Sequence, residues 1–293
     1  MRFCSNKLLV LTHEIKALST FIRTNTTTST HFGFEKIKEE EKQQRGNLEA
    51  SYGFAPLWPR ALLGVSLKTV FSNVAKKYDL MNDAMSLFIH RLWKDYYVQN
   101  LPLNKNCKVV DVAGGTGDIA FRIAERMGAN GNWAVTIVDI NENMLEVGKL
   151  RVPPNYSSHL NWVTANAESL PFEDNSFDIY TIAFGIRNCT HPEKVLNEAF
   201  RVLKPKGMFS CLEFGKVNNP VIQNIYDLYS FQIIPVIGQL LVGDFNSYKY
   251  LVESIRVFPD QQKFSKMVKE AGFNNVTFEE LNFGICNIYC GIK

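Results

Sequence analysis

The chain has 293 residues, of which 46% are hydrophobic, and its 32 Lys and Arg residues against 29 Asp and Glu residues give a formal net charge of +3. This content is enough to bury a substantial core, and so mild a charge, without a block of basic residues, argues against a nucleic-acid partner. The longest uncharged stretch, 228–243, is interrupted by Gln232 and Pro235, and it is shorter than the roughly 18 apolar residues that a membrane-spanning helix needs.

The six cysteines are scattered, with no C-x-x-C pair and no Cys/His cluster. This spacing indicates free thiols in a reducing compartment, and we expect no metal site.

The N-terminal segment 1–34 carries four basic residues against the single acid Glu14 and ends in a run rich in Ser and Thr. This composition is typical of a mitochondrial transit peptide; a disordered basic tail is the alternative. Segment 35–50 is densely charged without apolar periodicity, which indicates a linker. We therefore expect one folded domain over 51–293.

Apolar residues in 65–101 follow a helical spacing with a polar interruption at 79–83, which predicts two helices packed over a sheet. A second helical cap or lid segment is expected near 216–250. Between these segments strands alternate with helices, as in a parallel sheet. Strands are expected at Val109–Val112, Ala134–Val138, Leu160–Thr164, Ile179–Phe184 and Phe209–Leu212, with helices at Ile119–Met127, Glu142–Leu150 and Pro192–Leu203.

The C-terminal part has a different pattern, because the helix predicted at Gln261–Ala271 is followed by two strands, Val276–Leu281 and Ile285–Gly291. Only the short turn at Asn282–Gly284 joins them, so these two strands must be antiparallel. The sequence therefore predicts an α/β fold with helices on both faces of a mostly parallel sheet and a reversed last strand.

A glycine-rich turn, with Gly114, Gly115 and Gly117, follows the first strand of this sheet. Such a turn lets a ligand lie directly on the backbone. The spacing also fits a dinucleotide fingerprint, with Asp139 about 20 residues further on to accept ribose hydroxyls. Asp111 favours a different ligand, because its carboxylate would repel a pyrophosphate and attract the ammonium and sulfonium of S-adenosylmethionine. A purely structural glycine turn is the remaining alternative.

Several segments resemble the quinone-biosynthesis C-methyltransferases, the ubiquinone/menaquinone methyltransferase family. The resemblance covers roughly residues 67–293. Its first signature is matched by Tyr78–Asn82 with Ser86, His90 and Trp93, and its second by Arg201–Gly207 running to Glu213 and Phe214. Further matches are Asn166–Phe172, Phe184–Asn188 and 244–255. The chain departs from the family at Lys206, where glycine is usual, and at Gly215 and Ala183, where serine is usual or frequent.

The resemblance implies a Rossmann-like class I methyltransferase that uses S-adenosylmethionine without a metal. The donor would be held at the carboxyl ends of the strands. The implied donor-site residues are Asp111, Gly115, Thr116, Gly117, Asp139, Asn166 and Ala167. On the residues alone, Asn166 also fits a loop cap.

The substrate implied by the resemblance is a reduced methoxy-polyprenyl-benzoquinol of coenzyme Q synthesis. With the leader, it implies a peripheral protein on the matrix side of the mitochondrial inner membrane, in a complex with other proteins of the pathway or as a homodimer. The apolar segment 228–242 is expected to accept the prenyl tail; an ordinary buried helix is the alternative. A catalytically silent scaffold and a nicotinamide-dependent reductase remain alternative functions.

Catalysis requires ionisation of a phenol near pKa 10, about three units above neutral pH. Arg187 is our first candidate for stabilising the phenolate or orienting a water that takes the proton, and His90 is the alternative base. Tyr78, Asn82 and Asn188 are expected to orient the ring. On sequence alone, His90 also fits a core histidine, and Arg187 a surface ion pair.

Overall fold

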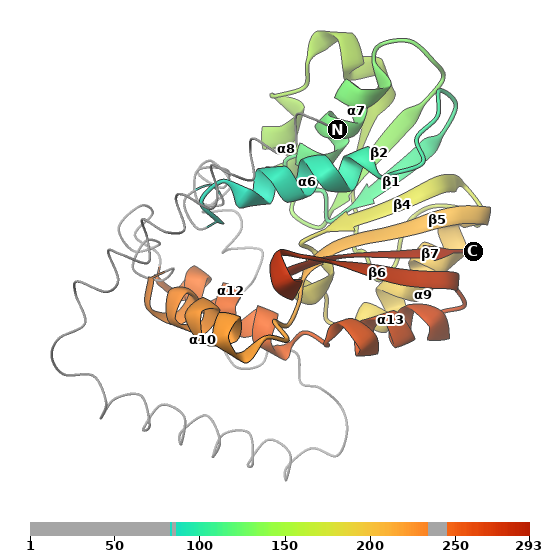
Figure 1. The fold of residues 1–293 in the computed structure, drawn as a ribbon. Coiled ribbons are helices and arrows are strands. Elements are labelled where there is room, and N and C mark those ends of the chain that lie inside the picture. The colour runs from blue at the N-terminus through green and yellow to red at the C-terminus, as the bar shows by residue number, and fades with distance from the viewer. Residues whose placement is uncertain (1–82, 84–85, 234–244) are drawn as a thin grey trace, which may run out of the picture. The chain divides into compact units, whose positions relative to one another are not determined.

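The computed structural model describes Asp83 and residues 86–233 and 245–293, except the side chains of 231–232 and 245–250. These residues form a seven-stranded sheet with the order β3-β2-β1-β4-β5-β7-β6 (Figure 1). The strands are β1 (Lys108–Val112), β2 (Ala134–Asp139), β3 (Leu160–Thr164), β4 (Phe177–Ala183), β5 (Leu203–Phe214), β6 (Asn274–Leu281) and β7 (Cys286–Ile292).

The first five strands pair in parallel, whereas β7 is antiparallel to both β5 and β6. The turn η5 (Asn282–Gly284) between β6 and β7 is too short for a crossover, so β7 must reverse. The predicted fold class, with its reversed last strand, is confirmed. The reversed strand lies inside the sheet and β6 forms the edge.

Helices cover both faces of the sheet. The side chains of α6 (Ile89–Gln99), α7 (Asp118–Met127) and α8 (Glu142–Lys149) pack in one buried cluster with alternate residues of the strands, including Val109, Ile137 and Ile179. The other cluster joins α9 (Pro192–Val202) and α13 (Gln261–Glu270) to the intervening strand residues. Because successive strand residues point to opposite faces, Asp111 belongs to the same face as Val109, beneath α6 and α7.

Two further helices follow β5. Helix α10 (Pro220–Leu228) continues into a π-helical turn, η4 (Tyr229–Ile233), and α12 (Phe245–Val257) lies beside α10, to which the Asp227–Arg256 ion pair ties it (Figure 1). The Asn219 side chain caps α10 by accepting from Val221 N and Ile222 N. Two short 3₁₀ helices, η2 (Pro154–His159) and η3 (Ile186–Asn188), lie earlier in the chain. Nowhere in the described ranges is a helix both long and apolar enough to cross a bilayer.

Most predicted boundaries agree with the structure within a few residues, with one clear exception. Strand β5 begins at Leu203 instead of Phe209, so the helix ends one residue before its predicted end. The residues around Pro205 form a bulge in the strand. Lys206 takes a left-handed conformation there, with φ 68°. The predicted segments 1–34 and 35–50 and the first of the two expected helices before β1 lie outside the described residues.

Candidate functional site

The carboxyl ends of the parallel strands meet at one edge of the sheet, where the glycine turn connects β1 to α7. Gly115 and Gly117 have φ values of 56° and 84°, in the left-handed region. A Cβ on Gly114 would lie 2.6 Å from Ile137 Cγ2, and one on Gly117 would lie 2.8 Å from the Trp162 ring. Gly114 and Gly117 therefore permit close packing. Gly115 is half-buried and Thr116 is buried.

Asp139, at the end of β2, faces the glycine turn. Its Oδ2 accepts a hydrogen bond from Gly115 N at 2.9 Å, and its Oδ1 accepts from Asn141 N at 2.8 Å. A carboxylate can accept up to about four hydrogen bonds, so these two do not exhaust its capacity. Burial raises the pKa of Asp139, although the backbone donors oppose this shift. The carboxylate both fixes the turn and can accept further hydroxyl donors.

Asp111, at the start of the turn, is fully buried on the face covered by α6 and α7. Its Oδ1 accepts from Thr181 Oγ1 at 2.8 Å, while Oδ2 has no hydrogen-bond partner among the described residues. Burial raises the pKa of Asp111 to about 7. A buried carboxylate oxygen without a donor costs free energy unless a ligand supplies one. The two carboxyl groups of Asp111 and Asp139 and the glycine turn between them, here called the glycine cradle, therefore fit a cationic nucleoside cofactor.

Asn166 and Ala167 follow β3. The Asn166 side chain accepts from Glu168 N at 3.0 Å, which is the loop contact expected of a cap, and it is exposed. Ala167 packs its side chain in the core cluster under α9. Any contact of Ala167 with a cofactor would therefore come from its backbone.

Arg187 lies in η3, after β4, the strand next to β1. Its guanidinium is buried and pairs with Glu213 at the end of β5, with 2.8 Å between Nη1 and Oε1. Nη1 also donates to Phe184 O at 2.5 Å, and Nε has no partner among the described residues. Arg187 therefore forms a buried ion pair and not the surface ion pair that was the alternative from the sequence. Its Nη1 binds Glu213, and its buried Nε has no hydrogen-bond partner among the described residues.

Aromatic rings border this ion pair. Trp93, Phe184 and Phe214 form a cluster with centroid separations of 4.8–6.4 Å, and the Arg187 guanidinium lies 5.2 Å from the Phe214 ring centre. Phe184 and Ala113 both have positive φ values, 54° and 53°, at the ends of β4 and β1. Strained backbone of this kind is often held in place at ligand sites. Asn188 lies beside this cluster and donates weakly to Phe184 O at 3.5 Å.

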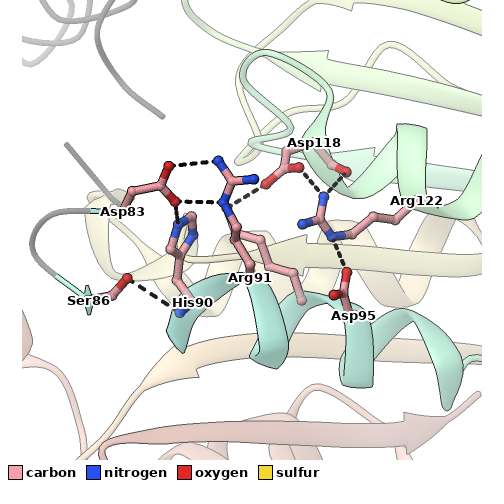
Figure 2. Close-up of polar contacts among 8 residues, drawn as sticks. Asp83, Ser86, His90, Arg91, Asp95, Asp118 and Arg122 are labelled. Carbon is pink, nitrogen blue, oxygen red and sulfur yellow. Dashed lines mark hydrogen bonds and ion pairs between the residues drawn. The ribbon is translucent and has the colours of Figure 1, made fainter. Parts of the chain in front are cut away.

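His90 lies at the start of α6 in a charged network (Figure 2). Its Nε2 is 2.8 Å from Asp83 Oδ1, and the same carboxylate receives Nε and Nη2 of Arg91. Burial lowers the pKa of His90, and the charge of Lys94 lowers it further, against the opposing effect of Asp83. The ring is therefore neutral near pH 7, with Nδ1 as the acceptor when Nε2 donates to Asp83.

Tyr78 and Asn82, predicted to orient the ring, lie outside the described residues. The sequence alone predicts no role for Glu213 or Lys94, although Glu213 belongs to the second family signature. A long-range ion pair leaves no local pattern in a sequence, so only the strand-end position of Glu213 could have pointed to it.

One departure from the family signature, Gly215, has a structural explanation. The left-handed conformation of Lys206 accounts for the glycine that is usual there, and nothing in the structure explains the lysine. At Gly215, a Cβ would lie 1.9 Å from the Asn287 amide nitrogen, so the Asn287 side chain excludes serine unless it moves. Ala183 packs at the edge of the cluster beneath α6.

Comparisons with known proteins agree with this architecture. The ubiE/COQ5 methyltransferase family model matches residues 63–293. The mitochondrial 2-methoxy-6-polyprenyl-1,4-benzoquinol methylase of Caenorhabditis elegans is 51% identical over 90% of this chain and 85% of its own length; the human protein of that name is 46% identical over 90% and 84%.

Among solved structures, a SAM-dependent methyltransferase from Thermotoga maritima, described as a possible histamine N-methyltransferase, superimposes with a TM-score of 0.54. At 18% identity, over 78% of this chain and all of that one, this likeness supports the fold alone. The family model spans all the described elements of the sheet and its helices, so the chain belongs to the ubiE/COQ5 methyltransferase family.

Proposed function

We propose that the protein methylates a ring carbon of a reduced methoxy-polyprenyl-benzoquinol, with S-adenosylmethionine as donor, in coenzyme Q synthesis. The relatives that share about half of its residues carry the name of that methylase. The observation that carries the chemistry is the buried Arg187–Glu213 pair, which follows β4 beside the acidic glycine cradle of β1.

The donor site would be formed by the glycine turn, Asp111 and Asp139. Asp139 would accept the ribose hydroxyls, and Asp111 would face the ammonium end, where its unpartnered Oδ2 gains a donor. Gly115, Thr116 and Gly117 would lie along the ligand, with Asn166 and Ala167 at its adenine end. When bound, S-adenosylmethionine supplies a methyl group activated by the positive sulfonium.

The ring carbon of a reduced quinone attacks well only when a neighbouring hydroxyl is ionised, which needs about 4 kcal/mol of help at pH 7. Arg187 is suited to this task because its open Nε can donate to a phenolate oxygen or a bridging water while Glu213 fixes Nη1. The new carbon–carbon bond forms as the carbon–sulfur bond breaks, and the ring carbon then loses its proton to water. Asn188 and the aromatic cluster would orient the ring.

His90 remains the second candidate for the base. Its lowered pKa leaves an unprotonated ring near neutral pH, and Asp83 orients that ring in the manner of a base and its partner. Arg187 is favoured because its open donor lies at the substrate end of β4, whereas His90 is occupied in the α6 network.

The mitochondrial names of the relatives support a mitochondrial location, and segment 1–34 would be the targeting leader and 35–50 its linker. We further propose a peripheral position on the matrix side of the inner membrane. The exposed Val221 and Ile225 on α10 support contact with a lipid surface. Segment 228–242 would accept the prenyl tail; its part 234–242 lies outside the described residues. Other proteins of the pathway or a second copy of the chain would be the protein partners.

The direct test is to incubate the protein with methyl-labelled S-adenosylmethionine and a reduced methoxy-benzoquinol bearing a prenyl tail. Label on a ring carbon of the product is the expected result, and label on oxygen or nowhere would contradict the proposal. Equilibrium dialysis adds a second readout: a methyltransferase retains S-adenosylmethionine and not NADH, a nicotinamide reductase does the opposite, and a silent scaffold fails to turn over the substrate.

A further inference from the structure

A second cation, Lys94, lies buried beside the proposed donor site. Lys94 belongs to α6, and only 6% of its surface is exposed. Lysines are almost never so buried without a partner. Its Nζ donates to Asp118 Oδ2 at 2.7 Å and lies 5.9 Å from the ring centre of Phe184. Lys94 thus touches both the residue that begins α7, directly after the glycine turn, and the aromatic cluster after β4.

Holding the start of α7 does not require Lys94. Asp118 also receives Arg122, which in turn pairs with Asp95 on α6 (Figure 2). These contacts tie α6 to α7 through a side chain that is more exposed than Lys94 and costs less to desolvate. The link between α6 and α7 therefore does not explain why the ammonium group of Lys94 is buried here.

The reason lies in the negative charges of this edge. Asp111, Asp118 and Asp139 converge on the glycine turn, and Asp111 points to the face that α6 covers. Burial disfavours the ionised form of Asp111, the charges of Asp118 and Asp139 disfavour it further, and the charge of Lys94 opposes them. Lys94 brings a positive charge to this cluster and pairs with Asp118, whose negative charge acts on Asp111 more strongly than the charge of Lys94 does.

We propose that Lys94 is a positioning residue for donor binding: its buried ammonium, anchored on Asp118, offsets the negative charges around the glycine turn so that the Asp111 carboxyl can receive the cationic end of the methyl donor. This inference rests on the proposed function, and it assigns to α6 a part in the donor site that the glycine turn alone does not show.

The other groups around Asp111 leave it as the main titrating group between pH 6 and 8.5. Tyr97 on α6 and Tyr180 on β4 are buried, and their pKa values lie well above 10. Thr181 on β4 does not titrate, and the pKa of His90 lies below its usual value. Asp118 on α7 is half-buried, and the charges of Lys94 and Arg122 outweigh the effect of burial and keep its pKa below the usual value. Burial raises the pKa of Asp139 on β2, so an Asp139→Asn comparison must accompany the titration.

The test measures the dissociation constant of S-adenosylmethionine by calorimetry from pH 6 to 8.5 in wild-type protein and Lys94→Gln. The ratio of the two constants at each pH cancels the titration of the donor's own amino group. Loss of a nearby opposite charge raises the pKa of a carboxyl group, typically by about one unit. For a shift of one unit from a pKa of about 7, we expect binding by Lys94→Gln to be weaker by about tenfold at pH 6 and about fivefold at pH 7, with a ratio that approaches one by pH 8.5.

Three variants make the result specific. Lys94→Arg retains the charge and should restore the wild-type pH profile. Arg122→Gln removes the other cation on Asp118 and should leave the profile in place. Asp111→Asn should abolish the effect of Lys94→Gln in a double variant, whereas Asp139→Asn should preserve it.

A ratio that stays constant across the pH range would overturn the proposal and leave Lys94 a packing role. If Lys94→Gln does not fold, Lys94→Met takes its place in the same titration. Retention of the wild-type pH dependence in Asp111→Asn would by itself overturn the proposal. Wild-type protein that binds no S-adenosylmethionine at any pH would instead overturn the proposed function itself.

Discussion

At the scale of single residues, the carboxylate of Asp139 has two roles that one substitution can test. Asp139→Ala removes an acceptor for the ribose hydroxyls and the anchor of Gly115 N. Charge-assisted hydrogen bonds of this kind contribute about 1.5–3 kcal/mol, so we expect roughly 10- to 150-fold weaker donor binding by calorimetry.

Asp178→Ala is the matched control for that measurement. The Asp178 carboxylate also holds a backbone amide, Lys108 N at 2.8 Å, but at the opposite end of β1. An unchanged dissociation constant in Asp139→Ala, or an equal loss in both variants, would contradict the assignment.

The Arg187–Glu213 pair makes a second prediction at this scale. Arg187→Lys leaves a cation for the buried Glu213 but removes the open Nε donor. We expect kcat to fall by roughly 100-fold while donor affinity holds, because Arg187 lies outside the glycine cradle. Part of the rate should return at high pH, where the phenol ionises without help. Full kcat in Arg187→Lys, together with inactive but folded His90→Ala, would identify His90 as the base.

The sequence indicated which residues lie at the candidate donor site, but it did not indicate which charged groups pair there. Glycines and strand-end carboxylates lie within one βα unit, so their spacing reveals Asp111, Gly115 and Asp139 together. Pairs such as Arg187–Glu213 and Lys94–Asp118 join elements 24 or more residues apart, and no local period records them. The burial of Asp111, which sets its ionisation, likewise depends on α6 covering that face.

At the scale of elements, hydrophobic period and turn length were sufficient for most of the fold. Alternating helices and strands predicted the parallel sheet, and the short Asn282–Gly284 turn predicted the reversal of β7. The bulge in β5 escaped prediction because Pro205 and Gly207 favour a loop locally. Residues on either side of it, Leu203 and those from Met208 onward, pair with β4 and keep the segment in the sheet.

Helix α10 gives the prediction that belongs to this scale. Ile225 is 60% exposed on α10, so an aspartate there should not unfold the protein. If α10 contacts lipid, Ile225→Asp should lower the fraction bound to vesicles of inner-membrane composition by about tenfold, since it removes an apolar contact and adds a charge. Leu150→Asp, at the end of α8 and 88% exposed, is the control. Equal loss in both variants, or none in either, would argue against α10 as the lipid contact.

At the scale of the whole molecule, the leader is the first feature to test. Segment 1–34 has a composition suited to import and precedes the family match at residue 63. We expect mature protein from the organelle to begin between about residues 25 and 50, as determined by N-terminal sequencing. Organelle-derived protein that still begins at Met1 would contradict a cleaved leader.

The free energy of unfolding of the whole molecule should depend on pH through the ionisation of Asp111. Its pKa is about 7 in the folded protein, against the ordinary 3.8. Between these values the unfolded chain has lost the proton and the folded chain keeps it, so stability falls as pH rises and the loss is complete above about pH 7. From pH 5 to pH 8 this one group should lower the free energy of unfolding by about 3 kcal/mol.

Asp111→Asn should therefore be more stable than wild type at pH 8 without donor, and the difference should shrink by about 3 kcal/mol at pH 5 in urea unfolding. S-adenosylmethionine should reverse the order at pH 8, because it stabilises the protein that binds it more tightly. Parallel pH dependence in the two proteins would show that Asp111 is not the group responsible. A stabilised variant with weakened donor binding would instead show that the fold tolerates a destabilising buried carboxyl because the donor requires its charge.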